Sequence, residues 1–110
     1  GGYIYCNPAN WPFDSWVHQS PNIVIVSAYY RLDMFGFLFT PEFVDPELGD
    51  FNVGFRDQTQ ALGWVCTHIG GDPGAVTINS ESAGGSSVEL HTTANVGRDL
   101  FKATIAQSAY

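Results

Sequence analysis

The feature that most constrains the fold is a predominantly apolar stretch over residues 22–30. Four consecutive side chains, from Ile23 to Val26, are β-branched, and apolar and polar residues do not alternate along the segment. A strand that is apolar on both sides must be covered on both faces, which is typical of parallel sheets packed between helices. We therefore predict a buried strand over residues 22–30.

An amphipathic pattern follows at residues 57–68. Asp57 and Gln60 have the spacing of a capping box, which would begin a helix at Asp57. Apolar residues then recur at helical spacing up to Ile69, and Gly70 and Gly71 follow as terminating residues. We predict a helix over residues 57–68.

The alternation of strands and helices continues to the end of the chain. Residues 75–78 are typical of a short strand, residues 83–93 of a helix and residues 103–107 of a third strand. The order strand, helix, strand, helix, strand indicates an α/β fold with parallel strands joined by crossover helices. Residues 1–22 and 31–55 are predicted to be loops whose aromatic side chains cover the core.

Composition excludes several classes of partner. The chain has 4 Lys and Arg against 11 Asp and Glu, a net charge of −7, so it cannot neutralise a run of phosphates on nucleic acid or on an anionic membrane. No apolar stretch approaches the roughly 18 residues of a membrane span. The 45% content of hydrophobic residues favours a packed core in a single domain over residues 1–110.

The candidate chemistry lies between the second strand and the second helix. Ser82 would occupy a sharp turn that holds its backbone under strain and projects its hydroxyl from the carboxyl edge of the sheet. Such a turn needs small residues two positions to either side, because the helix begins almost on top of the strand. Gly84 meets this requirement, and Ser80 meets it less well because it carries a Cβ and a hydroxyl.

Backbone amides near Ser82 could stabilise an oxyanion. The amide of Ala83 would lie at a helix start, where the negative charge forms when a serine attacks a carbonyl. Gly1 and Gly2 could belong to a glycine-rich loop that supplies further donors, since glycine lets the backbone approach a substrate closely.

Motifs along the whole chain resemble the type-B carboxylesterases, the cholinesterase-like branch of the α/β-hydrolases. The resemblance covers essentially the whole chain in the family's order, which is far more specific than the turn around Ser82 alone. The matching stretches are Gly1-Gly2-Tyr3, Tyr30-Arg31-Leu32, Phe35-Gly36-Phe37-Leu38, Gly49 to Asn52, Gly54, Asp57-Gln58, Ala61-Leu62-Gly63-Trp64-Val65, Gly70-Gly71-Asp72-Pro73, Val76-Thr77-Ile78, Glu81-Ser82-Ala83-Gly84-Gly85, Leu100-Phe101 and Ile105-Ala106-Gln107-Ser108.

The resemblance implies a partial α/β-hydrolase fold with a nucleophile elbow. It implies that Ser82 is the acylated nucleophile, that Gly1, Gly2 and Ala83 supply oxyanion-hole amides, and that Glu81 lines the pocket beside the serine. Members of this family hydrolyse small carboxylic esters through an acyl-enzyme, without a metal or cofactor. Secretion is also expected from the resemblance, with the signal peptide outside this chain.

The chain contains no complete catalytic triad. His91 follows Ser82 by nine residues on the same predicted helix, which places it about 13 Å along the axis. His18 and His68 precede the serine and are interpreted as surface or packing residues, and Asp99 as a solvated turn residue. We expect an internal fragment of a larger esterase whose acid and histidine lie beyond residue 110 and which is inactive by itself.

Three differences from the family pattern keep alternatives open. Ser80 and Asp33 stand where the family has glycine, and about three residues are missing between Ile69 and Gly70. The alternatives are a cholinesterase-like binding or adhesion domain that has lost catalysis, and an inactive truncated product. Cys6 and Cys66 could be free or paired with each other, and the oligomeric state and the particular ester are undetermined by the sequence.

Overall fold

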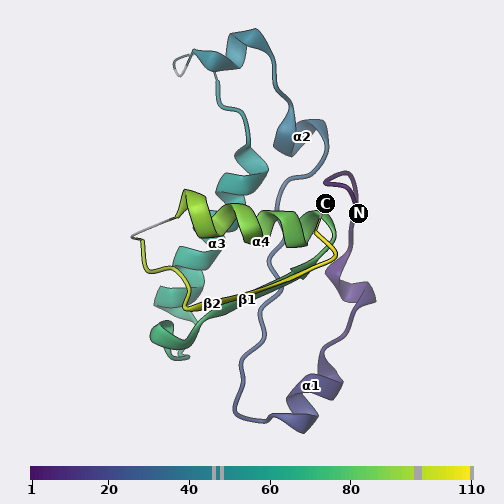
Figure 1. Ribbon diagram of the computed structural model, residues 1–110, viewed down its shortest axis with the longest axis vertical. Coiled ribbons are helices and arrows are strands. Elements are labelled where there is room, and N and C mark those ends of the chain that lie inside the picture. Colours follow the sequence, from purple (N-terminus) through teal and green to yellow (C-terminus); the bar gives the residue numbers. More distant parts are fainter. Residues whose placement is uncertain (46, 48, 96–97, 110) are drawn as a thin grey trace.

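The computed structural model describes residues 1–45, 47, 49–95 and 98–109 (Figure 1). Four α-helices and two strands lie in these residues, together with three short 3-10 helices. In chain order the elements are η1 (Pro8–Asn10), α1 (Asp14–Gln19), α2 (Met34–Phe37), η2 (Pro41–Val44), α3 (Val53–His68), η3 (Pro73–Ala75), β1 (Thr77–Glu81), α4 (Ala83–Ala94) and β2 (Ala103–Gln107).

The sheet is parallel, as the sequence predicts. β1 pairs with β2 from Thr77 opposite Ala103 to Glu81 opposite Gln107, and α4 is the crossover that lies along one face of the pair (Figure 1). The close approach of α4 depends on Gly85, where an added Cβ would lie 2.7 Å from the carbonyl oxygen of Gln107. The prediction for β2 is confirmed in full, and the helix predicted over residues 83–93 extends to Ala94.

The prediction of a strand over residues 75–78 is only partly right. The chain forms η3 through Ala75, capped by the Asp72 side chain on the amide of Gly74, and β1 begins at Thr77. The strand therefore begins two residues later and continues to Glu81, directly before Ser82.

The prediction of a strand over residues 22–30 is wrong for this structure. The segment runs irregularly from the end of α1 towards α2 and pairs with no strand in the part of the chain that the structure describes (Figure 1). Its side chains are mostly exposed, and Val24 retains 64% of its accessible surface. A β-branched run forms a strand only where another strand completes its hydrogen bonds, and none of the described residues provides such a strand for this segment.

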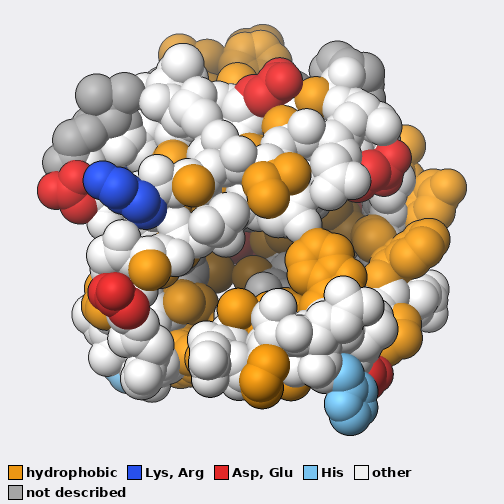
Figure 2. All heavy atoms as spheres, turned by 60° about the horizontal axis from the view of Figure 1, so that its bottom comes forward, with side chains coloured by type: hydrophobic (Ala, Val, Ile, Leu, Met, Phe, Trp, Pro, Cys, Tyr) orange, Lys and Arg blue, Asp and Glu red, His pale blue; other side chains and the backbone are white. Residues whose placement is uncertain are grey.

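A hollow separates residues 22–30 from the sheet and its helices. It has a volume of about 740 Å³ and is bordered by residues 22–30 on one side and by α3, β1 and α4 on the other. Figure 2 shows a hollowed face with hydrophobic side chains around the opening. The hollow therefore lies along the uncovered edge of the sheet.

The core is smaller than the composition suggests. Ala83 and Val88 of α4 are its buried hydrophobic residues among those described. The prediction that loop aromatics cover the core is wrong for several of them, since Trp11 is 69% exposed and Phe35 is 75% exposed. The sheet is also poorly covered, since α4 lies on one face of the two strands and every residue of β2 is exposed.

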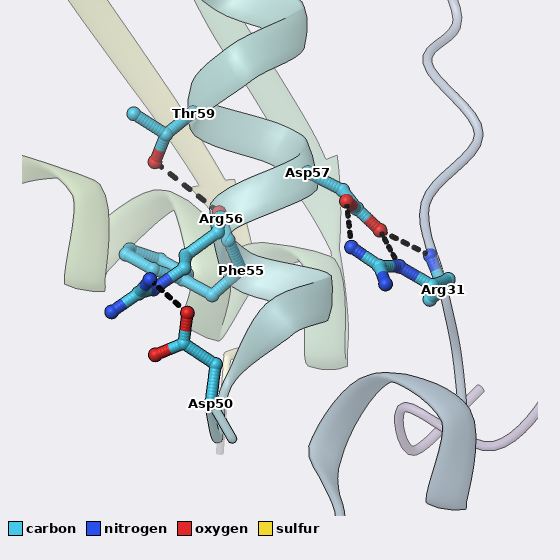
Figure 3. Close-up of polar contacts among 6 residues, drawn as sticks. All are labelled: Arg31, Asp50, Phe55, Arg56, Asp57 and Thr59. Carbon is cyan, nitrogen blue, oxygen red and sulfur yellow. Dashed lines mark hydrogen bonds and ion pairs between the residues drawn. The ribbon is translucent and has the colours of Figure 1, made fainter. Parts of the chain in front are cut away.

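The predicted capping box at Asp57 is also wrong. α3 begins four residues earlier, at Val53, after Asn52 in the left-handed conformation. The carboxylate of Asp57 instead binds Arg31, on a segment 26 residues away, through the Arg31 backbone amide at 3.1 Å and the guanidinium at 2.7 and 2.8 Å (Figure 3). A bidentate ion pair with arginine is a strong interaction, so the Asp57 carboxylate binds this tertiary partner and does not cap the helix.

Candidate active site

Ser82 lies on a strained turn between β1 and α4. Its φ of 57° and ψ of −126° fall in a region that residues with a side chain rarely adopt, which costs about 1–3 kcal/mol. The surrounding structure fixes this conformation, since the Ser82 amide donates to the Gln107 carbonyl at 2.9 Å and its own carbonyl accepts from Ser86 at 3.0 Å. The backbone therefore has the geometry that the sequence predicts for a nucleophile elbow.

Small residues allow the helix to begin this close to the strand. A Cβ added at Gly84 would lie 2.8 Å from the Cβ of Ser80, which no pair of real side chains tolerates. Ser80 is therefore accommodated because its partner is glycine. Glu81, the last residue of β1, is exposed beside Ser82.

The start of α4 offers hydrogen-bond donors beside the serine. Ala83 is the first residue of the helix and is 3% exposed. The first amides of a helix have no acceptor within the helix, and its dipole favours negative charge at that end. An anion that develops next to Ser82 would therefore be stabilised by this helix start.

Gly1 and Gly2 form a tight turn at the other end of the chain. The Ile4 amide donates to the Gly1 carbonyl at 3.1 Å, and both Gly2 and Tyr3 have a φ of 63°. Tyr3 links this turn to α4, because its hydroxyl accepts a hydrogen bond from Ser87 at 3.2 Å.

His91 is buried in α4 and belongs to a polar network. Its Nε2 lies 3.0 Å from Gln58 Oε1, its Nδ1 lies 2.6 Å from Asn95 Nδ2, and its ring stacks on Phe55 with centroids 4.1 Å apart. Burial lowers the pKa of His91 below its usual value, which favours the neutral ring. Both ring nitrogens of His91 have partners, and about 13 Å of helix separates His91 from Ser82. His91 is therefore not positioned to accept the proton of Ser82.

The other titratable candidates lie apart from the elbow. His18 is in the last turn of α1, and His68 ends α3, where its ring stacks on Trp64 at 4.9 Å and its Nδ1 lies 3.0 Å from the Trp64 carbonyl. Asp99 lies in the segment between α4 and β2, with a φ of 49°. None of these residues forms a hydrogen bond with Ser82 in the part of the chain described here.

Sequence reasoning missed the side-chain network that joins α3 to α4. Gln58 of α3 donates to Ser87 at 3.3 Å while its carbonyl oxygen faces His91. Gln58 precedes Ser87 by 29 positions and His91 by 33, so no local pattern marks its contacts with them. Helical spacing could only have predicted that they lie on inward faces.

Asp33 explains one difference from the expected family pattern. Its φ of 54° and ψ of −144° are typical of glycine, and its side chain forms no cap on α2.

Two titratable groups near Arg31 have shifted pKa values. The hydrogen bond from Arg31 lowers the pKa of Asp57 despite partial burial. Burial raises the pKa of the nearby Tyr30 phenol.

The large hollow described above is not lined by Ser82 or Glu81, so it is not assigned as the substrate pocket. Both cysteines line it as free thiols, without a disulfide.

Among the described residues, no group of three His, Cys, Asp or Glu side chains gathers where a metal could bind. None of the described helices combines the length and the hydropathy needed to cross a bilayer.

A family model described as "Carboxylesterase family" matches residues 1–110. The chain belongs to the carboxylesterase family. Esterase cest-33 of Caenorhabditis elegans is 43% identical over 93% of this carboxylesterase chain, and the acetylcholinesterase of Bungarus fasciatus is 43% identical over 98% of it. The chain spans 19% and 18% of these two relatives, or about a fifth of their length.

The fold of the carboxylesterase chain also has a solved counterpart. A thermophilic PNB esterase superposes with a TM-score of 0.65 at 41% identity, covering 73% of this chain and 17% of that structure. The parallel strands and helices are thus a partial α/β-hydrolase fold, as the resemblance in sequence implies.

Proposed function

We propose that this chain is the nucleophile-bearing part of a longer enzyme that hydrolyses small carboxylic esters through a serine. The proposal depends above all on Ser82, a residue held at a positive φ between a strand and a helix start. The matched carboxylesterase family and the names of its relatives support the reaction class. The missing acid and histidine would come from the four fifths of the relatives' length that this chain does not span.

The proposed reaction begins when Ser82 Oγ attacks the ester carbonyl carbon and its proton passes to the histidine elsewhere in the enzyme. The carbonyl oxygen becomes an oxyanion, which the amides of Ala83, Gly1 and Gly2 would stabilise. The carbon–oxygen bond of the ester breaks, the alcohol leaves with the proton, and water then releases the acid from Ser82. Glu81 would form part of the pocket wall at the same edge of the sheet.

The decisive experiment is to label the longer protein with a fluorophosphonate, which phosphonylates an activated serine and releases fluoride. We expect one adduct, located at Ser82 by peptide mass spectrometry, and no adduct in Ser82→Ala. A correctly folded protein without an adduct at Ser82 would contradict the proposal and would favour a binding or adhesion domain.

A second experiment tests the division of the active site. The 110-residue chain alone is expected to show no Ser82-dependent hydrolysis of an activated acetate ester, because its described residues place no base beside Ser82. Turnover by this chain that disappears in Ser82→Ala would show that the base is present here and would overturn that part of the proposal.

We also propose that the longer protein is secreted. The sequence upstream of Gly1 in the gene tests this directly, since a charged segment followed by an apolar stretch of 7–15 residues is expected there.

A further inference from the structure

The turn that carries Gly1 and Gly2 requires an unusual backbone at Tyr3. Gly2 and Tyr3 are consecutive residues with a φ of 63°, and the turn is closed by the bond from the Ile4 amide to the Gly1 carbonyl. Glycine adopts this conformation freely, but tyrosine does so only where its surroundings impose it. The contacts of Tyr3 therefore determine whether the turn forms.

Three contacts fix Tyr3 from three directions. Its carbonyl accepts from the amide of Asp33 at 2.8 Å, and its ring lies 4.9 Å from that of Phe37 in α2. Its hydroxyl accepts from Ser87 Oγ at 3.2 Å. The first two contacts hold the turn against α2, and the third fastens it to α4.

The Ser87 hydroxyl is itself oriented by its neighbours. Ser87 is 4% exposed, and Gln58 Nε2 donates to its oxygen at 3.3 Å. A serine hydroxyl has one proton, so a Ser87 oxygen that accepts from Gln58 directs its proton to Tyr3. The Gln58 amide is held in turn by His91, which lies 3.0 Å from its carbonyl oxygen.

This arrangement connects both halves of the proposed oxyanion hole. Ser87 lies five residues after Ser82 on α4, the helix that presents the Ala83 amide, while Tyr3 directly follows Gly1 and Gly2. We propose that Tyr3 is a positioning residue: its hydrogen bond to Ser87 sets the Gly1-Gly2 turn relative to the start of α4. The inference rests on the proposed function, because it concerns how the Gly1 and Gly2 amides are positioned relative to the Ala83 amide.

The test uses the longer enzyme and compares Tyr3→Phe, Ser87→Ala and the double variant by steady-state hydrolysis of an activated acetate ester. Tyr3→Phe keeps the ring that contacts Phe37 and removes only the hydroxyl. We expect kcat to fall by between about 2-fold and 10-fold, the equivalent of one net hydrogen bond, while KM stays unchanged. The double variant is expected to be no slower than the slower single variant, because both changes remove the same bond.

Tyr29→Phe is the matched control. The Tyr29 hydroxyl donates to the Asn7 side chain at 3.1 Å, a bond between residues outside the proposed oxyanion hole, so its loss is expected to leave kcat unchanged. A trifluoromethyl ketone gives a second measurement, since its carbonyl becomes an oxyanion when a serine adds to it. Its inhibition constant is expected to rise with Tyr3→Phe by the same factor as kcat falls, at a temperature where all variants are folded.

The possible failures are distinguishable. A wild-type enzyme without a fluorophosphonate adduct at Ser82 would overturn the proposed function and this inference with it. A labelled wild-type enzyme with an unchanged kcat and ketone affinity in Tyr3→Phe would overturn only the inference. A fall in kcat that merely follows loss of folded protein in thermal unfolding, or effects that multiply in the double variant, would also overturn it.

Discussion

Ser80 and Gly84 face each other across the elbow so closely that a Cβ on Gly84 would lie 2.8 Å from the Cβ of Ser80. Gly84→Ala is therefore expected to lower the free energy of unfolding by about 1–3 kcal/mol, the usual cost of overpacking. Removing the opposing side chain with Ser80→Gly is expected to restore most of that loss. Chemical denaturation of the two single variants and the double variant measures the coupling.

A second glycine provides the control for this cycle. Gly63 lies within α3, and an added Cβ there would have no neighbour within 4 Å. Gly63→Ala is expected to stabilise the chain by up to about 1 kcal/mol, because alanine is the better helix former. Additive effects of Gly84→Ala and Ser80→Gly would show that the two positions do not compete for the same space.

The strained backbone at Ser82 predicts a difference in stability between two variants at this position. Ser82→Gly and Ser82→Ala both remove the hydroxyl, but only glycine relieves the backbone at a φ of 57°. The glycine variant is expected to unfold with a free energy about 1 kcal/mol higher than the alanine variant. Thermal unfolding of the pair gives the comparison, and equal midpoints would mean that the turn is not strained.

The parts of this fold that could be predicted from sequence are those set by local patterns. The helix over residues 83–93, predicted despite its glycines, and the strand over residues 103–107 both follow from the local residue pattern. The strand predicted over residues 22–30 could not follow in the same way, because a strand also needs a partner, and among the described residues β1 pairs with β2 alone. Residue pattern predicts the tendency of a segment but not its neighbour.

The candidate site divides along the same line. The position of Ser82 at a strand-to-helix turn can be predicted from five consecutive residues, 80–84. The link from Tyr3 to Ser87 joins residues 84 positions apart, so only the folded chain shows it. Asp57 shows the same limit, since its spacing to Gln60 predicts a cap whereas Arg31 is its partner.

Asp33 occupies a conformation that glycine would adopt without strain. Its backbone amide and carbonyl form hydrogen bonds that glycine retains, and its side chain forms no cap on α2. Asp33→Gly is therefore expected to raise the free energy of unfolding by about 1 kcal/mol, and Asp33→Ala is not. Urea denaturation of the two variants tests this, and a loss of stability in Asp33→Gly would show that the aspartate side chain has a stabilising partner.

The bond between Arg31 and Asp57 predicts how stability changes in acid. Hydrogen bonding to Arg31 lowers the pKa of Asp57 in the folded chain below its ordinary value of 3.8, so the unfolded chain binds the proton first as the pH falls. The stabilisation is thus complete above about pH 5 and is lost as the pH falls through the folded pKa. Asp57→Asn is expected to flatten this acid decline in denaturant midpoints measured from pH 6 to pH 2.

Asp50 supplies the comparison for Asp57. It pairs with Arg56 at the exposed surface (Figure 3), where an ion pair contributes little to stability. Asp50→Asn is expected to keep the wild-type acid decline. An unchanged decline in Asp57→Asn would mean that the carboxylate does not gain stability from Arg31.

His91 predicts a second decline at higher pH. Neutral His91 accepts from Asn95 at Nδ1 and donates from Nε2 to Gln58, whereas a protonated ring would present two donors to this buried site. Asn95 would have to turn its oxygen to the ring and give up the bond that it accepts from Arg98. Protonation of His91 therefore opposes folding.

The sign follows from the lowered pKa of His91 in the folded chain. Between the ordinary value of 6.5 and the lower folded value, the unfolded chain binds more protons, so stability falls as the pH falls through this range. One proton gives a slope of at most about 1.4 kcal/mol per pH unit.

His91→Gln is expected to be less stable at pH 7, because it loses the stacking on Phe55, and to lack this slope. Denaturation from pH 7.5 to pH 5 measures both effects, with His68→Gln at the exposed end of α3 as the variant that keeps the slope. A slope that persists in His91→Gln would assign the titration to another group and show that the buried network tolerates the charged ring.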